Sequence, residues 1–498
     1  MMIILAYNFG IEAFRVPTGS MEPTVYGDPL WGDRALVNKL AYRLGEPERG
    51  DICVFRFPMN RSQPFVKRLV GKPGEDVLIA QGDVYIKGEG DEYPMIWRKE
   101  GGVRDSMWLP YYAYEGGGEL TLSTDFDRLS GRASVEGNAI TLEASDGKPG
   151  TLRFPRGKSI TDHNPTTARE FDSQYNRESV ADLRVRCELS GSGKLDICLV
   201  RGGGTVTLKL SGAQSAVEIL CVGDKNPMVI PLSGPALKAK VDLDAMASLI
   251  FGVADGAVDI ELNGHAFDRI YFDTEVERYL RAQAVPLDFE HMAGIRRLMS
   301  ALPDRSDCHI RFIVNEGSMT LRNLFIDRDI HYLGVMEFER GSRGLAAKAG
   351  VSRPYFHRVQ GDSFFVLGDN TENSLDSRGW YTMTLALEGG EKYFFQLETL
   401  LAAARQQVME EWQVRMLAAL TQSPVGENVN DALEALGDAI TRGDFGAKLI
   451  LIDIFGIERA VVASKVKGVE ASHTPDVPRD LMDGQLLGSL FPKPRFLN

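Results

Sequence analysis

The sequence has few cysteines and histidines, and neither residue type stands in a metal-binding pattern. Its five cysteines form no Cys-x-x-Cys pair and its seven histidines are scattered, which argues against a zinc site or a disulfide-dense scaffold and leaves the redox compartment open. The GxSxG and HExxH motifs, the phosphate-binding loop and a GxGxxG motif after a strand are also absent, so the common signatures of α/β hydrolases, zinc proteases and nucleotide-binding enzymes are missing. We therefore expect no metal and no other cofactor.

An excess of positive charge is also lacking. The 56 lysines and arginines stand against 69 aspartates and glutamates, which gives a formal net charge of -13. Nucleic-acid binding draws its affinity from lysines and arginines that neutralise phosphates, so we expect no nucleic-acid partner. With 44% hydrophobic and 25% charged residues, the composition is that of a globular protein, and the length predicts about three domains.

The apolar stretch at the N-terminus is short. Residues 1–7 are apolar, but Asn8, Gly10 and Glu12 interrupt the run, and about 20 apolar residues are needed to cross a bilayer. The stretch also lacks the basic start and the small-residue cleavage site of a secretory signal. Either the protein is soluble or residues 1–14 are the remnant of a longer membrane anchor, and we favour the anchor.

Short runs of β-type residues dominate the first two thirds of the chain. Between residues 15 and 88 they alternate with Gly-Asp, Pro-Gly and Arg-Gly turns, which predicts an all-β unit. The many candidate strands from about residue 116 to 332 predict a separate sandwich or jelly roll, with a helix near residues 289–302. The apolar spacing of residues 393–420 predicts a helix, and residues 429–440 predict a second one.

Three segments carry residue types that are suited to peptide-bond chemistry. The first is the segment 16–24, in which two prolines flank a serine, and the second is an apolar pair followed by a lysine and an arginine at positions 65–68. The third is the polar segment that follows a strand-like run at positions 364–378. Alone, each segment is explained by a turn, a strand with a snorkelling lysine or a polar loop. Their occurrence together, in this order, favours a functional interpretation.

These segments resemble the conserved boxes of the bacterial type I signal peptidases, serine-lysine endopeptidases that release secretory signal peptides. The similar positions are Pro17 to Thr24, Gly32-Asp33 with Val37, Lys39 and Tyr42, Arg49 to Ile52, Val66 to Arg68 with Gly71, Pro73-Gly74 and Val77, and Gly368 to Arg378. A weaker likeness lies at Val477-Pro478. The boxes cover a minority of the chain, but five of them in the family's order are a specific signal.

The resemblance implies a role for each site residue. Ser20 is the nucleophile and Lys67 the general base, which requires that burial keep the lysine amine neutral by lowering its pKa. The hydroxyl of Thr18 and the backbone N–H of Ser20 form the oxyanion hole. Ser374 orients the lysine, and two ion pairs support the site: Arg68 with Asp369, and Asp376 with Arg378.

The resemblance also implies a substrate and a location. The substrates are secretory preproteins cut after small residues in an Ala-X-Ala pattern. By this resemblance we expect the enzyme at the cytoplasmic membrane, with its catalytic domain on the extracytoplasmic side and membrane lipid as a partner.

Long interruptions between the boxes predict a mainly β protein whose catalytic β-fold carries two insertions. The expected segments are residues 1–14 (anchor remnant), 15–112 (catalytic β domain, first part), 113–333 (jelly-roll or lectin-like β-sandwich), 334–388 (catalytic domain, second part), 389–469 (helical insertion) and 470–498 (closing segment). A glycan or a protein is a possible ligand of the sandwich.

Two other hypotheses stay open. A self-cleaving repressor would share the serine-lysine chemistry, but the sequence has neither a helix-turn-helix pattern nor a basic face. A non-catalytic glycan- or protein-binding protein would use the sandwich and keep the peptidase scaffold as a relic. The joint presence of Ser20, Lys67 and Ser374 argues against that hypothesis.

Overall fold

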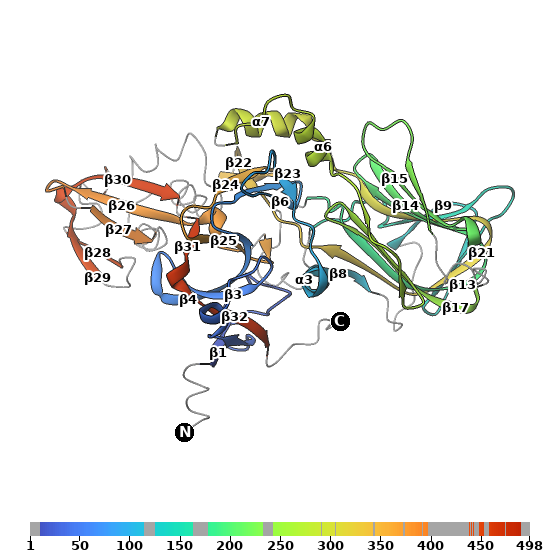
Figure 1. The fold of residues 1–498 in the computed structure, drawn as a ribbon, viewed down its shortest axis with the longest axis horizontal. Coiled ribbons are helices and arrows are strands. Elements are labelled where there is room, and N and C mark those ends of the chain that lie inside the picture. The colour runs from blue at the N-terminus through green and yellow to red at the C-terminus, as the bar shows by residue number, and fades with distance from the viewer. Residues whose placement is uncertain are drawn as a thin grey trace, which may run out of the picture. The chain divides into compact units, whose positions relative to one another are not determined.

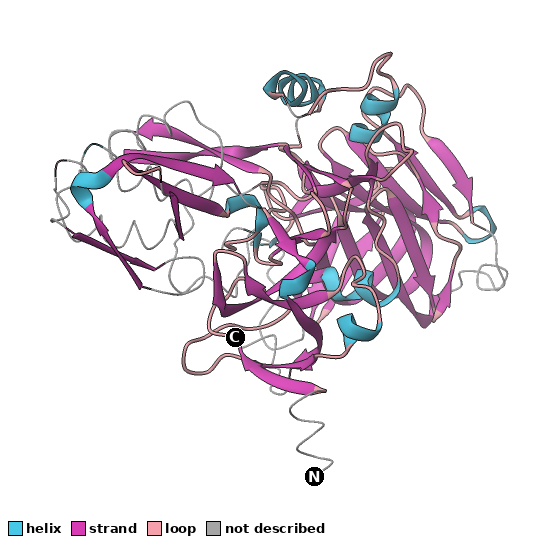
Figure 2. Cartoon of the chain, turned by 60° about the vertical axis from the view of Figure 1, so that its left-hand side comes forward, coloured by secondary structure: helices cyan, strands magenta, loops and turns pink. Residues whose placement is uncertain are grey.

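The computed structural model describes most of the chain. The described residues are 10–113, 125–162, 178–232, 243–289, 291–303, 305–341, 344–371, 374–390, 392–396, 438, 440, 442, 448–452, 458–473 and 475–489. The chain forms two compact units: the first contains Met1–Pro94, Arg169–Asn176 and Tyr332–Asn498, and the second contains Met95–Ala168 and Arg177–His331. Strands predominate in both units, and the helices are short (Figures 1 and 2).

The main sheet of the first unit has seven antiparallel strands. Their order is β1 (Ile11–Arg15), β2 (Arg34–Asn38), β32 (Met482–Ser489), β3 (Ile52–Phe57), β4 (Asn60–Gly71), β25 (Ser363–Leu367) and β31 (Asp476–Pro478). In this sheet β4 lies between β3 and β25, although β25 follows β4 by almost 300 positions in the sequence. Cys53 of β3 stands opposite Lys67 of β4, and Leu367 of β25 stands opposite Arg68.

Smaller elements complete the first unit. They are β24 (Tyr355–Arg358) paired with β5 (Asp76–Ala80), which pairs with β6 (Asp83–Lys87); the hairpin of β22 (Val335–Gly341) and β23 (Gly344–Arg353); the sheet β27 (Lys392–Gln396), β26 (Tyr381–Leu387) and β30 (Val466–His473); the pair β28 (Lys448–Ile452) and β29 (Glu458–Val462); α2 (Ala41–Leu44); and the 3-10 turns η3 (Ser377–Gly379), η4 (Ala463–Lys465) and η5 (Arg479–Leu481).

An aromatic cluster joins early and late parts of the chain in this unit. The ring of Phe57 stacks on Phe65 with centroids 4.3 Å apart, and the buried Trp380 packs edge-on against Phe57 at 5.3 Å. Burial of such large rings is a dominant source of core stability. The cluster therefore fixes the segment after β25 against β3 and β4.

The second unit is a β-sandwich built from one continuous set of paired strands. Its main path is β10 (Arg132–Glu136), β11 (Ala139–Glu143), β21 (Cys308–Asp329), β13 (Leu183–Arg201), β14 (Gly204–Leu210), β15 (Ala216–Leu220) and β16 (Met228–Pro231). The other elements are β7 (Met95–Ile96), α3 (Gly101–Met107), β8 (Trp108–Ala113), β9 (Asp127–Ser130), β12 (Gly150–Phe154), η1 (Gly212–Gln214), β17 (Leu243–Ala254), β18 (Ala257–Leu262), β19 (His265–Ala266), β20 (Ile270–Tyr271), α6 (Glu275–Arg281) and α7 (Met292–Ala301).

Two long strands fold this set over a single hydrophobic core. The first part of β13 pairs with β17 and its last part pairs with β14, while β21 runs beside both parts. The change of partner occurs at Gly191 and Gly193, where a Cβ on Gly193 would lie only 2.0 Å from the carbonyl oxygen of Glu316. Residues from both parts of β13, including Val185 and Ile197, belong to the same core, as the packing of two layers requires.

The mainly β fold with an inserted β-sandwich is confirmed, and α7 lies within the predicted helix at residues 289–302. The second compact unit begins at Met95, whereas the predicted insertion begins at residue 113.

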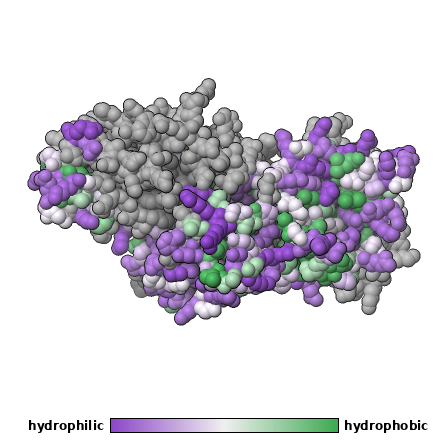
Figure 3. Space-filling model, turned by 90° about the horizontal axis from the view of Figure 1, so that it is seen from above, coloured by the Kyte–Doolittle hydropathy of each residue, from purple (hydrophilic) through white to green (hydrophobic). Residues whose placement is uncertain are grey.

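Among the described residues, no helix has both the length and the apolar composition needed to cross a bilayer. On the face drawn in Figure 3, the described hydrophobic residues form scattered patches among hydrophilic ones.

The prediction of a helical insertion at residues 389–469 is wrong over most of its described residues, because β27, β28, β29 and the first part of β30 within it are strands. Residues 393–396, expected to begin a helix, form β27 and pair with β26. The backbone of Gly390 adopts a positive φ of 82° and its N–H donates to the Leu387 carbonyl, so a tight turn starts a hairpin that the apolar spacing did not reveal. The rest of the predicted helix lies outside the described residues. Of the second predicted helix, Asp438 and Ile440 are described, and both are helical.

Candidate active site

Ser20 lies on a turn that buried side chains hold in place. Val16 and Met21, on either side of the serine, are 4% and 0% exposed and pack in one cluster with Val25 and Ala35. The N–H of Glu22 donates to the Gly19 carbonyl at 3.1 Å, which closes the turn. The apolar residues around Ser20 thus anchor the segment, and Ser20 itself is only partly covered.

Lys67 reaches Ser20 from the central strand β4. Its Nζ donates to the Ser20 Oγ over 2.5 Å, and the residue is only 3% exposed. Burial lowers the pKa of Lys67 from 10.5 to about 8, because a charged ammonium is disfavoured away from water. Nearby Asp376 and Asp369 oppose this effect, and Arg378 adds to it. The lysine is therefore poised to exchange a proton near neutral pH.

A buried ion pair stands next to the lysine. The Nε and Nη2 atoms of Arg68 donate to the two oxygens of Asp369 at 2.8 and 2.6 Å, and the two side chains are 1% and 0% exposed. Arg68 also donates through Nη1 to the Gly50 carbonyl at 2.9 Å, and the Thr24 hydroxyl donates to Asp369 at 2.5 Å. Asp369 thereby ties β4 to the end of the serine segment.

A second buried ion pair closes the segment after β25. The guanidinium of Arg378 donates from Nε and Nη2 to the Asp376 carboxylate at 2.8 and 2.7 Å. Asp376 also accepts the N–H of Gly368 at 3.0 Å. Burial alone would raise the pKa of Asp376, but the adjacent Arg378 and these hydrogen bonds lower it, so the carboxylate stays charged.

Ser374 and Thr18 differ in how the structure places them. A Cβ on Gly368 would lie 2.0 Å from the Ser374 Oγ and 2.5 Å from the Ser20 carbonyl oxygen, so Ser374 lies beside the Ser20 segment. Its buried hydroxyl, however, makes no hydrogen bond with any described residue. The expected bond from Ser374 to Lys67 is therefore not formed in this structure. Thr18 is exposed beside the turn of Ser20.

Sequence reasoning missed one residue that contacts the serine turn twice. The side-chain amide of Asn370 donates to the Gly19 carbonyl at 2.9 Å, and its backbone N–H donates to the Ser20 carbonyl at 3.2 Å. The available signal was its position directly after Asp369 in the Gly-Asp-Asn segment. The hydrogen bond from the Thr24 hydroxyl to Asp369 was not predicted from the sequence either.

The N-terminal part of the chain is similar to signal peptidases. Residues 1–138 match the family described as signal peptidase, peptidase S26. A probable signal peptidase I-2 from Synechocystis sp. is 41% identical over 95 residues, which are 18% of this chain and 42% of that protein. Signal peptidase I of Aquifex aeolicus is 46% identical over 80 residues, 15% of this chain and 30% of that protein.

Another relative, signal peptidase I of Pseudomonas aeruginosa, is 36% identical over 101 residues, 18% of this chain and 34% of that protein. The chain thus spans less than half of the length of the relatives it matches. These matches confirm the resemblance to bacterial type I signal peptidases. Among solved structures, a carbohydrate-binding module from Bacillus subtilis covers 40% of this chain and 94% of its own at 7% identity, with a TM-score of 0.23 that is too low to support a shared fold.

Proposed function

We propose that this chain is a serine endopeptidase that cleaves signal peptides from secretory preproteins after small residues, with Ser20 as nucleophile and Lys67 as general base. The observation that carries the proposal is the 2.5 Å hydrogen bond between the Lys67 Nζ and the Ser20 Oγ, made by a lysine whose pKa burial lowers to about 8. A serine hydroxyl attacks a carbonyl only when a neighbouring base accepts its proton. A buried lysine that is neutral in part near pH 7 meets that need.

The reaction then proceeds in two halves. In the first, neutral Lys67 takes the Ser20 proton while Oγ attacks the scissile carbonyl carbon, and the resulting oxyanion accepts from the Ser20 N–H and the Thr18 hydroxyl. The intermediate collapses to a serine ester, and the Lys67 ammonium returns the proton to the leaving amine. In the second half, Lys67 deprotonates a water molecule that attacks the ester, and the Lys67 ammonium then returns the proton to the departing Ser20 Oγ.

The buried ion pairs have a supporting role in this scheme. The pair of Arg68 with Asp369 fixes β4 to the serine segment, and the pair of Asp376 with Arg378 fixes the loop that carries Ser374. Removing one partner of such a buried pair costs about 3–5 kcal/mol. We propose that Ser374 orients Lys67 after a change of the Ser374 rotamer, because the two side chains are not hydrogen-bonded in this structure.

Substrate choice follows from an extended peptide lying along a strand edge near Ser20, where shallow pockets accept small side chains and give the Ala-X-Ala pattern. The first compact unit supplies this catalytic domain. The sandwich is the inserted domain, for which a glycan or a protein is a possible ligand.

We place the chain at the outer face of the cytoplasmic membrane, and a loop of the catalytic unit supports contact with lipid. Leu30 and Trp31 are 74% and 76% exposed, and the Asp28 carboxylate holds their backbone N–H groups at 2.7 and 2.6 Å. Exposed tryptophan and leucine side chains favour the interface between water and lipid. Replacing both by serine should weaken sedimentation with anionic lipid vesicles, and unchanged sedimentation would count against lipid as a partner.

The test of activity uses the purified chain and a preprotein that carries an Ala-X-Ala site. We expect cleavage after the second alanine by the unaltered chain, and none by Ser20→Ala or Lys67→Ala. Ser62→Ala and Lys148→Ala are matched controls, because both residues are exposed and lie outside the site. If the unaltered chain is folded but as inert as the two site variants, the proposal is wrong and a non-catalytic binding function takes its place.

A further inference from the structure

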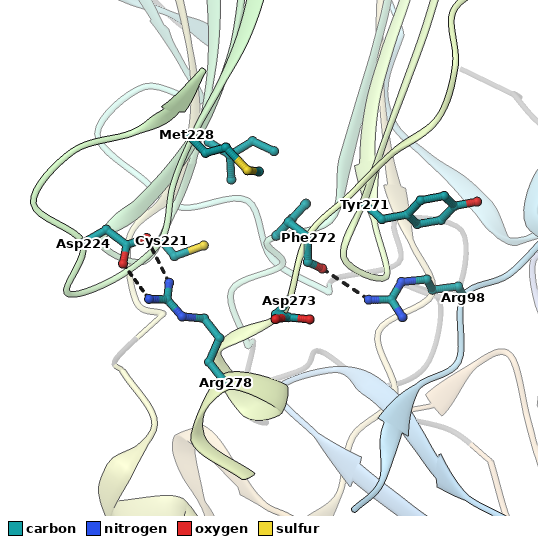
Figure 4. Close-up of a pocket in the computed structure, with 9 residues that line it drawn as sticks. Arg98, Cys221, Asp224, Met228, Tyr271, Phe272, Asp273 and Arg278 are labelled. Atoms are coloured by element: carbon teal, nitrogen blue, oxygen red, sulfur yellow. Dashed lines mark hydrogen bonds and ion pairs between the residues drawn. The ribbon is translucent and has the colours of Figure 1, made fainter. Parts of the chain in front are cut away.

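A cavity in the β-sandwich has no part in the proposed peptidase chemistry. It has a volume of about 360 Å³, within the range typical of small-molecule sites. One wall comes from the hairpin of β15 and β16, and the facing wall from β20 and the residues that lead into α6 (Figure 4). All of its lining residues belong to the second compact unit.

Charged groups of both signs line this cavity. Arg278, on α6, donates from both terminal nitrogens to the carboxylate of Asp224 at 3.0 and 2.5 Å (Figure 4). Arg98 donates to the Phe272 carbonyl at 3.3 Å, and Asp273 accepts a bidentate pair from Arg281. Two guanidinium groups and two carboxylates therefore line the cavity, and their formal charges cancel.

Apolar surface lies between these charges. Met228 and Tyr271 are 46% and 51% exposed on opposite walls, and Ile219, Cys221 and Phe272 also line the cavity. The guanidinium carbons of Arg98 and Arg269 lie 5.8 and 5.6 Å from the centre of the Tyr271 ring, and this contact holds the ring in place. The cavity thus combines apolar side chains with polar groups that hydrogen bonds hold in place.

This combination selects the chemistry of a ligand. An anion would meet Asp224 and Asp273, and a cation would meet Arg98 and Arg278. A wholly apolar molecule would remove water from these charged groups and offer no hydrogen bond in return, which is costly. A neutral molecule with hydroxyl groups at its edge and C–H groups on its face meets every requirement, because hydroxyls both donate to carboxylates and accept from guanidinium groups.

We propose that the sandwich binds a neutral saccharide in this cavity, with hydroxyls on the pair of Asp224 and Arg278 and on Asp273 and Arg98, and with C–H groups toward Met228 on one wall and Tyr271 on the other. The site goes beyond the proposed peptidase function. None of its residues belongs to the catalytic unit, so binding is measured without reference to cleavage.

The test is ligand-observed NMR with the full chain, followed by titration calorimetry. The probes are four neutral disaccharides (maltose, cellobiose, lactose and chitobiose) at millimolar concentration, with glucuronic acid and glucosamine as anionic and cationic counterparts. We expect saturable binding of at least one disaccharide and a weaker response, or none, from the two charged sugars. Asp224→Asn should raise the Kd at least about tenfold, because it weakens the acceptor and frees Arg278.

Two further variants separate a lost contact from a lost fold. Tyr271→Ala changes an exposed side chain and should also weaken binding about tenfold, with an unchanged melting temperature. Asp146→Asn is the matched control, since this exposed aspartate lies in a turn of the same unit with a φ of 55°, a backbone conformation that asparagine tolerates. The proposal is overturned if no disaccharide binds, if a charged sugar binds more tightly, or if Asp224→Asn and Tyr271→Ala bind as the unaltered chain does.

Discussion

The rate of cleavage should depend on pH through the amine of Lys67. Only the neutral amine can accept the Ser20 proton, and burial lowers the pKa of Lys67 to about 8. Below that pH, kcat/KM should therefore rise about tenfold for each pH unit, and above it the rate should level off. At pH 7 about one amine in ten is neutral, against about one in 3,000 for a lysine at 10.5, so burial increases the reactive fraction about 300-fold.

The assay is the initial rate of preprotein cleavage between about pH 6 and pH 10, with folding checked at each pH. Lys67→Arg is the matched control, because it keeps the positive charge but a guanidinium is not deprotonated in this range. We expect Lys67→Arg to be inactive throughout. A profile that is flat, or one that keeps rising through pH 10, would refute the assignment of Lys67 as a base with a lowered pKa.

Three further predictions concern the same site. Lys67→Met should raise the free energy of unfolding at pH 7 by up to about 3 kcal/mol, because the pKa of Lys67 is lower in the folded chain than in the unfolded chain. The unaltered chain gains stability as the pH rises from about 8. Urea titrations should therefore find that the advantage of the variant shrinks toward pH 10. Gly368→Ala should lower kcat/KM at least about 100-fold without unfolding the chain, because its Cβ would lie 2.0 Å from the Ser374 Oγ and 2.5 Å from the Ser20 carbonyl; an active variant would contradict this packing. Asn370→Ala should lower kcat about 10- to 100-fold with little change in KM, because the Gly19 carbonyl that Asn370 holds shares one planar peptide with the Ser20 N–H; a loss confined to KM would exclude this role.

The sequence was most informative where chemistry demands particular residue types at short spacing. The segments around Ser20 and Lys67 each occupy a few consecutive positions, and the matching relatives confirm the resemblance that these segments carry. The β-sandwich was also indicated by a local pattern. Apolar residues alternate along strands such as β14, because a strand in a sandwich buries every second side chain. The proposed roles of Ser20 and Lys67 stay predictions until activity is measured.

Other features depended on contacts that no local pattern encodes. Asn370 reaches Gly19 and Ser20 across about 350 positions, so only the folded chain reveals the contact. The apolar spacing after Gly390 suggested a helix, yet a two-glycine turn directed the chain back along β26 as a strand. The cavity of the sandwich is likewise assembled from separate segments, and the pairing of Asp224 with Arg278 is invisible in the sequence.

The position of the β-sandwich within the chain has a consequence for when the base becomes active. Lys67 lies on β4, but β25, which covers that strand on one side, follows the sandwich in the sequence. Before β25 pairs, β4 has an open edge, and water can solvate the lysine ammonium and hold its pKa near the usual value. We therefore expect the lowered pKa of Lys67 to arise only after the chain beyond the insertion has folded against β4.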